Sequence, residues 1–384
     1  MKKVLSKFIP MLLVLLLVLL GALVGDLAAK YGLASAKFSR WGAGQVISFL
    51  VLMMPLAWLL AVLAHELGHV LVGRTKDFVF HWLVAGPFMW KQEAGQLRFS
   101  WNKDLNTAGG MALCVPPDSH NLRRRFMAFA LGGPLASVAF AIIALGLYAL
   151  LPTPATELLG TLRTGLALSG GISATLAVAT LLPMHVGGFY SDGARALNLW
   201  RNGPAGQLEL AMLSALVPSM AGTRPRELPP ELLQAAATLP QELPFKLYVF
   251  HYLYLISLDR GQTEQAGDHL RQYRERLALM PTAWQGNIWL ESAFFAAAYQ
   301  HDLPAAQAFF VQAKPSPHIQ ADVPARAEAA LARAAGNAEL AHNKAQLALR
   351  ELPKNLDKGS ATLYAEWLTE TVQWAEKEAV ARTF

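Results

Sequence analysis

Four long runs of apolar residues lie in the first half of the chain, and no run of comparable length follows them. They cover residues 8–25, 42–73, 126–151 and 164–184. A membrane-spanning helix needs about 20 predominantly apolar residues, so each run is long enough to cross a bilayer. The pattern predicts a mainly α protein with a polytopic bundle of about four spans, the second of which is kinked or broken near Pro55.

Residues 1–41 are expected to form an N-terminal membrane anchor and its first loop. Lys2, Lys3 and Lys7 precede the first apolar run, which is typical of a helix whose N-terminus stays in the cytoplasm. A cleaved signal peptide is the alternative, with the small residues 34–36 as its cleavage site.

A segment rich in aromatic and β-branched residues, 77–102, separates the second apolar run from the third. The turn signal at 93–96 predicts a β-hairpin there. Trp82, Trp90 and Trp101 would suit the membrane–water interface. Two interpretations stay open: a loop on the membrane surface, and a sheet edge that captures an extended peptide by strand addition.

The second half of the chain is more polar and helical in pattern. Several prolines interrupt residues 205–244, which predicts a proline-rich linker between a membrane core and a soluble helical domain over 245–384. Turns within 259–266, 300–307 and 335–341 recur at intervals of 41 and 35 residues, a spacing typical of tetratricopeptide-like repeats. A plain helical bundle explains the pattern equally well. The domain either only packs or binds a cytoplasmic protein partner.

The composition excludes a wholly soluble protein, because 54% of the residues are hydrophobic, only 16% are charged and the mean hydropathy is +0.30. Residues 1–204 carry 17 Lys and Arg against 8 Asp and Glu, so the basic excess lies in the apolar half. Such charges set membrane topology, and we expect no nucleic-acid partner. Alternating spans then leave both termini in the cytoplasm of a multi-pass protein, which we expect in a bacterial plasma membrane. The single cysteine, Cys114, excludes an internal disulfide.

The strongest chemical motif is His65-Glu66-Leu67-Gly68-His69, inside the second apolar run. Residues four apart share one face of a helix, so the imidazoles of His65 and His69 can reach one zinc ion while Glu66 reaches a bound water. Ionisable side chains inside a span are costly and indicate a function. His65 precedes Arg74 by nine residues, or ~13 Å along a helix, which puts the site between the cytoplasmic face and the midplane.

A catalytic zinc usually takes three protein ligands and leaves one position for water. Asp192 and His185 both follow the fourth apolar run at the depth of the histidine pair, and both are candidates for the third ligand. Local chemistry favours Asp192 only slightly, because an aspartate before a glycine at a helix start can also be an ordinary N-cap.

The chain resembles the site-2 protease family of intramembrane metalloproteases in the order of its motifs. The His65–His69 motif is followed by Gly132-Gly133-Pro134 and later by Asp192-Gly193, and Gly109-Gly110-Met111 is similar to the family's Gly-Gly element. The resemblance covers roughly residues 42–200.

This resemblance implies that His65, His69 and Asp192 bind zinc and that Glu66 is the catalytic base. Ser137 stands where the family often has asparagine, and the spacing before Asp192 is longer than usual.

The expected function is that of a zinc-dependent metalloendopeptidase that cleaves membrane-embedded protein substrates. In this mechanism zinc activates water, Glu66 transfers its proton to the leaving amide nitrogen, and a helical substrate unwinds before attack. The expected partners are a membrane-spanning substrate, the lipid bilayer and a cytoplasmic protein. The alternative is a non-proteolytic membrane scaffold with a structural or vestigial zinc site and a protein-binding helical domain.

Overall fold

The structure is a computed structural model that describes residues 49–93, 96–102, 109–118, 120–152, 156–186, 189–280, 285–314 and 319–381. The apolar run at 8–25, expected to be the first span, lies outside these residues.

Three helices of the described chain are long and apolar enough to cross a membrane. They are α3 (Met54–Thr75), α4 (Leu122–Leu150) and α5 (Glu157–Leu181). A π-helical turn, Phe49–Met53, leads into α3, so the helical geometry changes directly before Pro55, where we expected a kink. The described parts of the second, third and fourth apolar runs therefore form long helices, and a total of about four spans stays a prediction.

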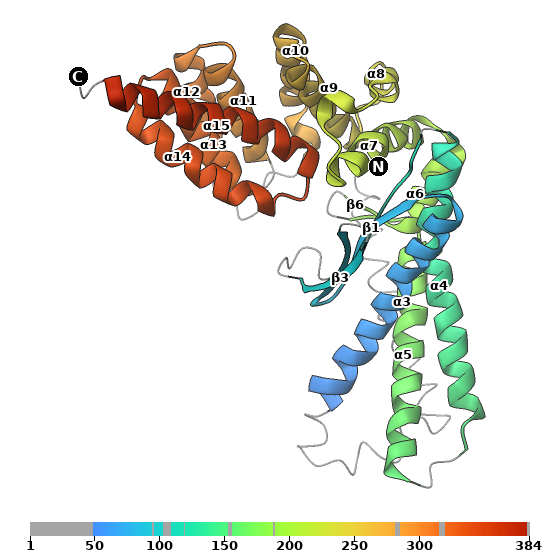
Figure 1. The fold of residues 1–384 in the computed structure, drawn as a ribbon. Coiled ribbons are helices and arrows are strands. Elements are labelled where there is room, and N and C mark those ends of the chain that lie inside the picture. The colour runs from blue at the N-terminus through green and yellow to red at the C-terminus, as the bar shows by residue number, and fades with distance from the viewer. Residues whose placement is uncertain are drawn as a thin grey trace.

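The three long helices lie side by side, and α4 packs against both of the others (Figure 1). Arg125 fastens the start of α4 to the end of α3. Its Nε donates to the carbonyl of Lys76 at 2.9 Å, its Nη1 pairs with Asp118 at 2.8 Å, and its guanidinium lies 5.1 Å from the centre of the Phe78 ring. The contacts of Arg125 thus hold the end of α3 and the start of α4 together, next to the sheet that lies between them in sequence.

A four-stranded antiparallel sheet, in the order β3-β2-β1-β4, occupies the place of the expected hairpin. The strands are β1 (Val79–Ala85), β2 (Phe88–Glu93), β3 (Gln96–Trp101) and β4 (Met111–Val115). The hairpin around 93–96 is confirmed as β2–β3, because Glu93 pairs with Gln96. It was an incomplete prediction, since β1 pairs with β2 across a tight turn at Gly86 (φ 57°) and with β4 on its other side.

The segment expected to be a linker, 205–244, is largely helical. After the two-stranded ribbon of β5 (His185–Val186) and β6 (Phe189–Tyr190) come α6 (Asp192–Arg201), α7 (Pro204–Met220), a 3-10 turn (Pro225–Glu227) and α8 (Glu231–Ala237). Both α7 and α8 pack against α9 (Phe245–Asp259). The segment is thus joined to the helices that follow it, and the domain boundaries stay a prediction.

The remaining helices form the three helix-turn-helix units that the sequence predicts (Figure 1). Beyond α9 these are α10 (Thr263–Glu275), α11 (Gln285–Ala298), α12 (Leu303–Gln312), α13 (Asp322–Ala334) and α14 (Ala338–Glu351), closed by α15 (Lys358–Ala381). Their likeness to tetratricopeptide repeats stays a prediction.

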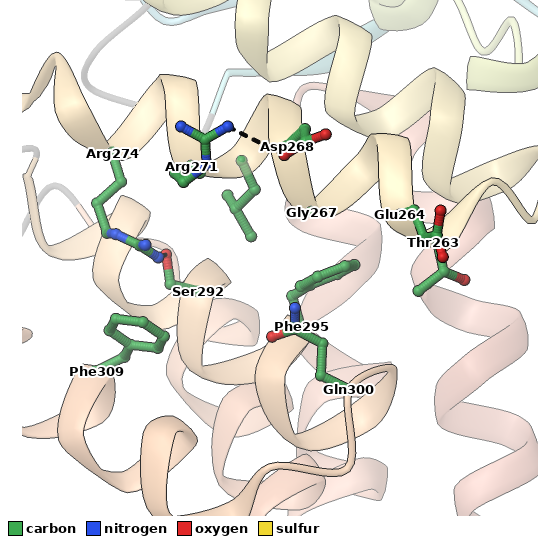
Figure 2. A pocket seen from close by; sticks show the side chains of 11 residues that line it. Thr263, Glu264, Gly267, Asp268, Arg271, Arg274, Ser292, Phe295, Gln300 and Phe309 are labelled. Atoms are coloured by element: carbon green, nitrogen blue, oxygen red, sulfur yellow. Dashed lines mark hydrogen bonds and ion pairs between the residues drawn. The ribbon is translucent and has the colours of Figure 1, made fainter.

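A hollow of about 550 Å³ opens between α10, α11 and α12. Figure 2 shows Arg274 and Phe309 at one end of it and Thr263 and Glu264 at the other. The Arg274 guanidinium lies 4.4 Å from the centre of the Phe309 ring, and Arg271 is paired with Asp268 at 3.1 Å.

The turns of the three units use the same left-handed backbone at corresponding places. Gly261 and Gly336 have φ values of 72° and 71°, whereas the middle unit has His301 at 54°. A side chain makes this conformation unfavourable by roughly 1–2 kcal/mol, and glycine avoids that strain.

We therefore expect His301→Gly to raise the free energy of unfolding by about 1 kcal/mol. Thermal unfolding of the full chain in detergent measures this change, with Gly261→Ala as the opposite control, which should destabilise. A lower melting temperature for His301→Gly would show that the imidazole makes a contact worth more than the strain.

Candidate metal centre

The site depends on an unusually close approach of α3 and α4. A Cβ atom added to Gly68 would lie 2.4 Å from the carbonyl oxygen of Gly132, and one added to Gly132 would lie 2.6 Å from that of Gly68. Real Cβ atoms do not come this close to backbone atoms, so only glycine fits at both positions. Small residues at a helix crossing let the backbones touch, which is how helices associate in lipid.

This approach lets α4 orient both imidazoles of the His65–His69 motif. His65 and His69 are buried on one face of α3. Nδ1 of His65 lies 2.9 Å from the hydroxyl of Ser137, and Nδ1 of His69 donates to the carbonyl of Phe129 at 2.7 Å. The two Nε2 atoms are then 3.3 Å apart and face the same point. Polar partners on the far nitrogen are the usual way in which a protein fixes metal-binding histidines.

Asp192 completes the cluster from the first residue of α6. Its Oδ2 lies 3.1 Å from Nε2 of His65 and 3.6 Å from Nε2 of His69, and the three donor atoms lie within 4.8 Å of one another. The helix is capped by Ser191, whose hydroxyl accepts the backbone N–H of Ala194 at 3.2 Å. The interpretation of Asp192 as the N-cap was therefore wrong, and its carboxylate is directed at the histidines.

The donor atoms suit a metal ion in number, type and spacing. Ligands about 2.1 Å from a tetrahedral zinc ion lie roughly 3.4 Å from one another, close to the observed separations of 3.1–3.6 Å. Nδ1 of His69 donates to the carbonyl of Phe129, so in the neutral imidazole Nε2 has the lone pair that can bind a metal ion. Burial of the Asp192 carboxyl favours its neutral form, but the imidazoles outweigh this effect and hold its pKa well below the usual range. A cation between the three groups would stabilise them.

Glu66 lies beside this cluster with its side chain buried. Gly110, the residue before β4, lies directly against the Glu66 side chain. Its φ is 112°, and a Cβ added to it would lie 2.6 Å from Oε1 of Glu66. Within the described part of the chain the Glu66 carboxylate has no hydrogen-bond partner.

The sequence analysis named Gly133 and Ser137 but assigned neither of them a place in the metal site. Ser137 contacts His65, which gives the serine a place in the site that the resemblance left open. An added Cβ at Gly133 would lie 2.3 Å from Nε2 of His69 and 2.6 Å from Nε2 of His65, so this glycine forms one wall of the site. The only signal for either residue was the Gly-Gly-Pro pattern at 132–134.

The other candidate ligand, His185, lies in the short strand β5. Its side chain lies outside the described residues. Of the predicted site residues, the structure thus brings together His65, Glu66, His69 and Asp192, and the preference for Asp192 over His185 stays a prediction.

Gly133→Ala is expected to weaken metal binding about tenfold or more, because the new methyl group occupies the space in front of both Nε2 atoms. Gly146→Ala is the matched control, since it lies on the same helix and its added Cβ meets no atom within 4 Å. Metal analysis of the two purified proteins distinguishes them. Equal metal content would mean that the imidazoles do not bind through Nε2.

In a comparison with family models, residues 53–362 match the model of peptidase family M50. The match includes the whole cluster and extends through most of the helical domain, well beyond the part that the sequence motifs covered. No curated protein and no solved structure matched the chain. The match spans more than half of the chain, and it agrees with the long apolar helices and the His65–His69–Asp192 cluster. The chain therefore belongs to peptidase family M50, the site-2 protease family of membrane-embedded metalloproteases.

Proposed function

We propose that this protein is a zinc-dependent intramembrane protease that hydrolyses peptide bonds of membrane-embedded protein substrates. The observation that carries the proposal is the convergence of two imidazole nitrogens and one carboxylate oxygen beside the buried Glu66. His65, His69 and Asp192 would hold the zinc ion, and Glu66 would be the catalytic base. The histidines lie within a helix that is long enough to cross a membrane.

When bound, zinc would polarise the scissile carbonyl and favour deprotonation of the attacking water. The remaining steps fall to the chain itself. Glu66 takes a proton from the water and donates it to the leaving amide nitrogen. Ser137 and the carbonyl of Phe129 keep the imidazoles oriented during this transfer.

A substrate helix hides its amide bonds in hydrogen bonds and must unwind before it can be cleaved. The outer strand β3 offers a place for the unwound segment, because it pairs only with β2 in the described sheet. Leu97, Phe99 and Trp101 on this strand are exposed. We infer that the edge holds the substrate by strand addition.

The cluster has three protein ligands among the described residues. A structural zinc site is normally closed by four, whereas a catalytic site keeps one position open. Three ligands are the number that the proposed catalytic site requires.

The sheet, α6 and the helical domain lie at the same end of the three long helices (Figure 1). Arg74, Lys76 and Arg123–Arg125 lie at this end, and we infer that it faces the cytoplasm, with both termini on that side. A cytoplasmic protein partner on the helical domain stays a prediction.

Glu66→Gln is expected to lower the turnover of a membrane-embedded substrate by about 100-fold or more, because the amide has the size of the carboxylate but cannot take a proton. Metal content and melting temperature should stay at the wild-type values, since the histidines are unchanged. A cleavage assay in detergent or liposomes measures the turnover. Activity near that of the wild type would contradict the role of Glu66.

Asp192→Ala is expected to remove most of the bound zinc, whereas His185→Ala should leave the zinc content unchanged. Zinc analysis of both purified variants compares the two candidate ligands directly. The reverse result would assign the third ligand to His185 and would favour a different site from the one proposed.

A further inference from the structure

The helix that carries Asp192 is held in place by a buried carboxylate from the next helix. Glu209 of α7 is fully buried, and its side chain accepts hydrogen bonds from Nε of Arg195 at 2.8 Å and from Nδ2 of Asn198 at 3.3 Å. Both partners lie on α6, three and six residues after Asp192. The carboxylate thus joins α7 to the helix that begins with the proposed metal ligand.

The contact between the two helices leaves little room for sliding. A Cβ added to Gly206 of α7 would lie 2.1 Å from the carbonyl oxygen of Asn198.

Burial raises the pKa of Glu209, so its carboxylate depends on Arg195 and Asn198 to remain charged. Removal of the charge would therefore weaken this constraint on α6.

The far end of α7 is itself fixed by the helical domain. Ser219 donates to Asp357 at 2.5 Å, and Arg224, just past the end of α7, makes a two-pronged pair with Asp259 of α9. An added Cβ at Gly359 would lie 2.0 Å from the carbonyl oxygen of Thr223. Because these contacts fix α7 to the helical domain, α7 can hold α6 in one position.

The start of α6 is fixed through Ser191 and through Gly193, whose added Cβ would lie 1.8 Å from the carbonyl oxygen of Leu181. A tilt of α6 about this point would move the Asp192 carboxylate relative to the imidazoles. The ion pair that Glu209 makes with Arg195 opposes this tilt, together with the packing of α6 against α4 and α7.

We propose that Glu209 is a positioning residue for the metal site, which holds α6 against α7 so that Asp192 faces His65 and His69. This inference rests on the proposed function, because it assumes that the cluster binds metal. It gives a buried ion pair outside the site a defined role in metal affinity. Partners around a ligand typically contribute a factor of 10 to 100 to metal affinity.

The test is the zinc dissociation constant of the full-length protein in detergent, measured by competition with a chromogenic chelator. Glu209→Gln should weaken zinc binding by about tenfold. The matched control is Glu291→Gln, which breaks another buried pair, the one between Glu291 and Arg326 at 2.9 Å in the helical domain. The control should lower the melting temperature and leave zinc affinity unchanged.

Zinc affinity of Glu209→Gln equal to that of the wild type would overturn the inference, and so would an equal loss of affinity in Glu291→Gln, which would indicate general destabilisation. If Glu209→Gln does not fold, Asn198→Ala removes one of the two contacts and should weaken affinity a few-fold. A wild-type protein without zinc affinity would instead contradict the proposed function.

Discussion

The glycine contact between α3 and α4 is the constraint on which the rest of the site depends. Gly68 and Gly132 bring the two backbones together, and only at this separation do Ser137 and the carbonyl of Phe129 reach the imidazoles. Lipid provides no hydrophobic force between helices, so close packing and polar contacts hold them. The same small residues that allow the helices to associate therefore also orient the proposed metal ligands.

The residues of the site that lie close together in the sequence could be predicted from it, whereas the residue that comes from a distant segment could not. Helical geometry alone places His65, Glu66 and His69 near one point, because residues four apart share a face. Asp192 lies 127 residues after His65, and no spacing rule connects them, so local chemistry favoured it only slightly over His185 and the preference came mainly from the resemblance. Serine at 191 could have been recognised as the better cap, since its hydroxyl reaches the N–H group three residues later.

The fold was predicted where the pattern is local and missed where it depends on pairing. The three long helices and the helix-turn-helix units follow from apolar runs and turn residues. The strands β1 and β4 escaped notice because strand formation depends on partners distant in sequence. In 205–244 the prolines suggested a linker, yet Pro204, Pro230 and Pro244 stand at or just before the first residue of a helix, where a missing N–H group is harmless.

The proposed ligands are far apart along the chain, so the ribosome adds the histidines well before Asp192. The helix that carries the histidines leaves the ribosome before Asp192 has been added, and Glu209, Asp259 and Asp357, which fix the supporting helix at its two ends, come later still. A nascent chain already inserted in the membrane thus holds an imidazole pair without its carboxylate. Such a chain lacks the complete set of ligands until residue 192 has been added, and the residues that hold Asp192 in position follow later still.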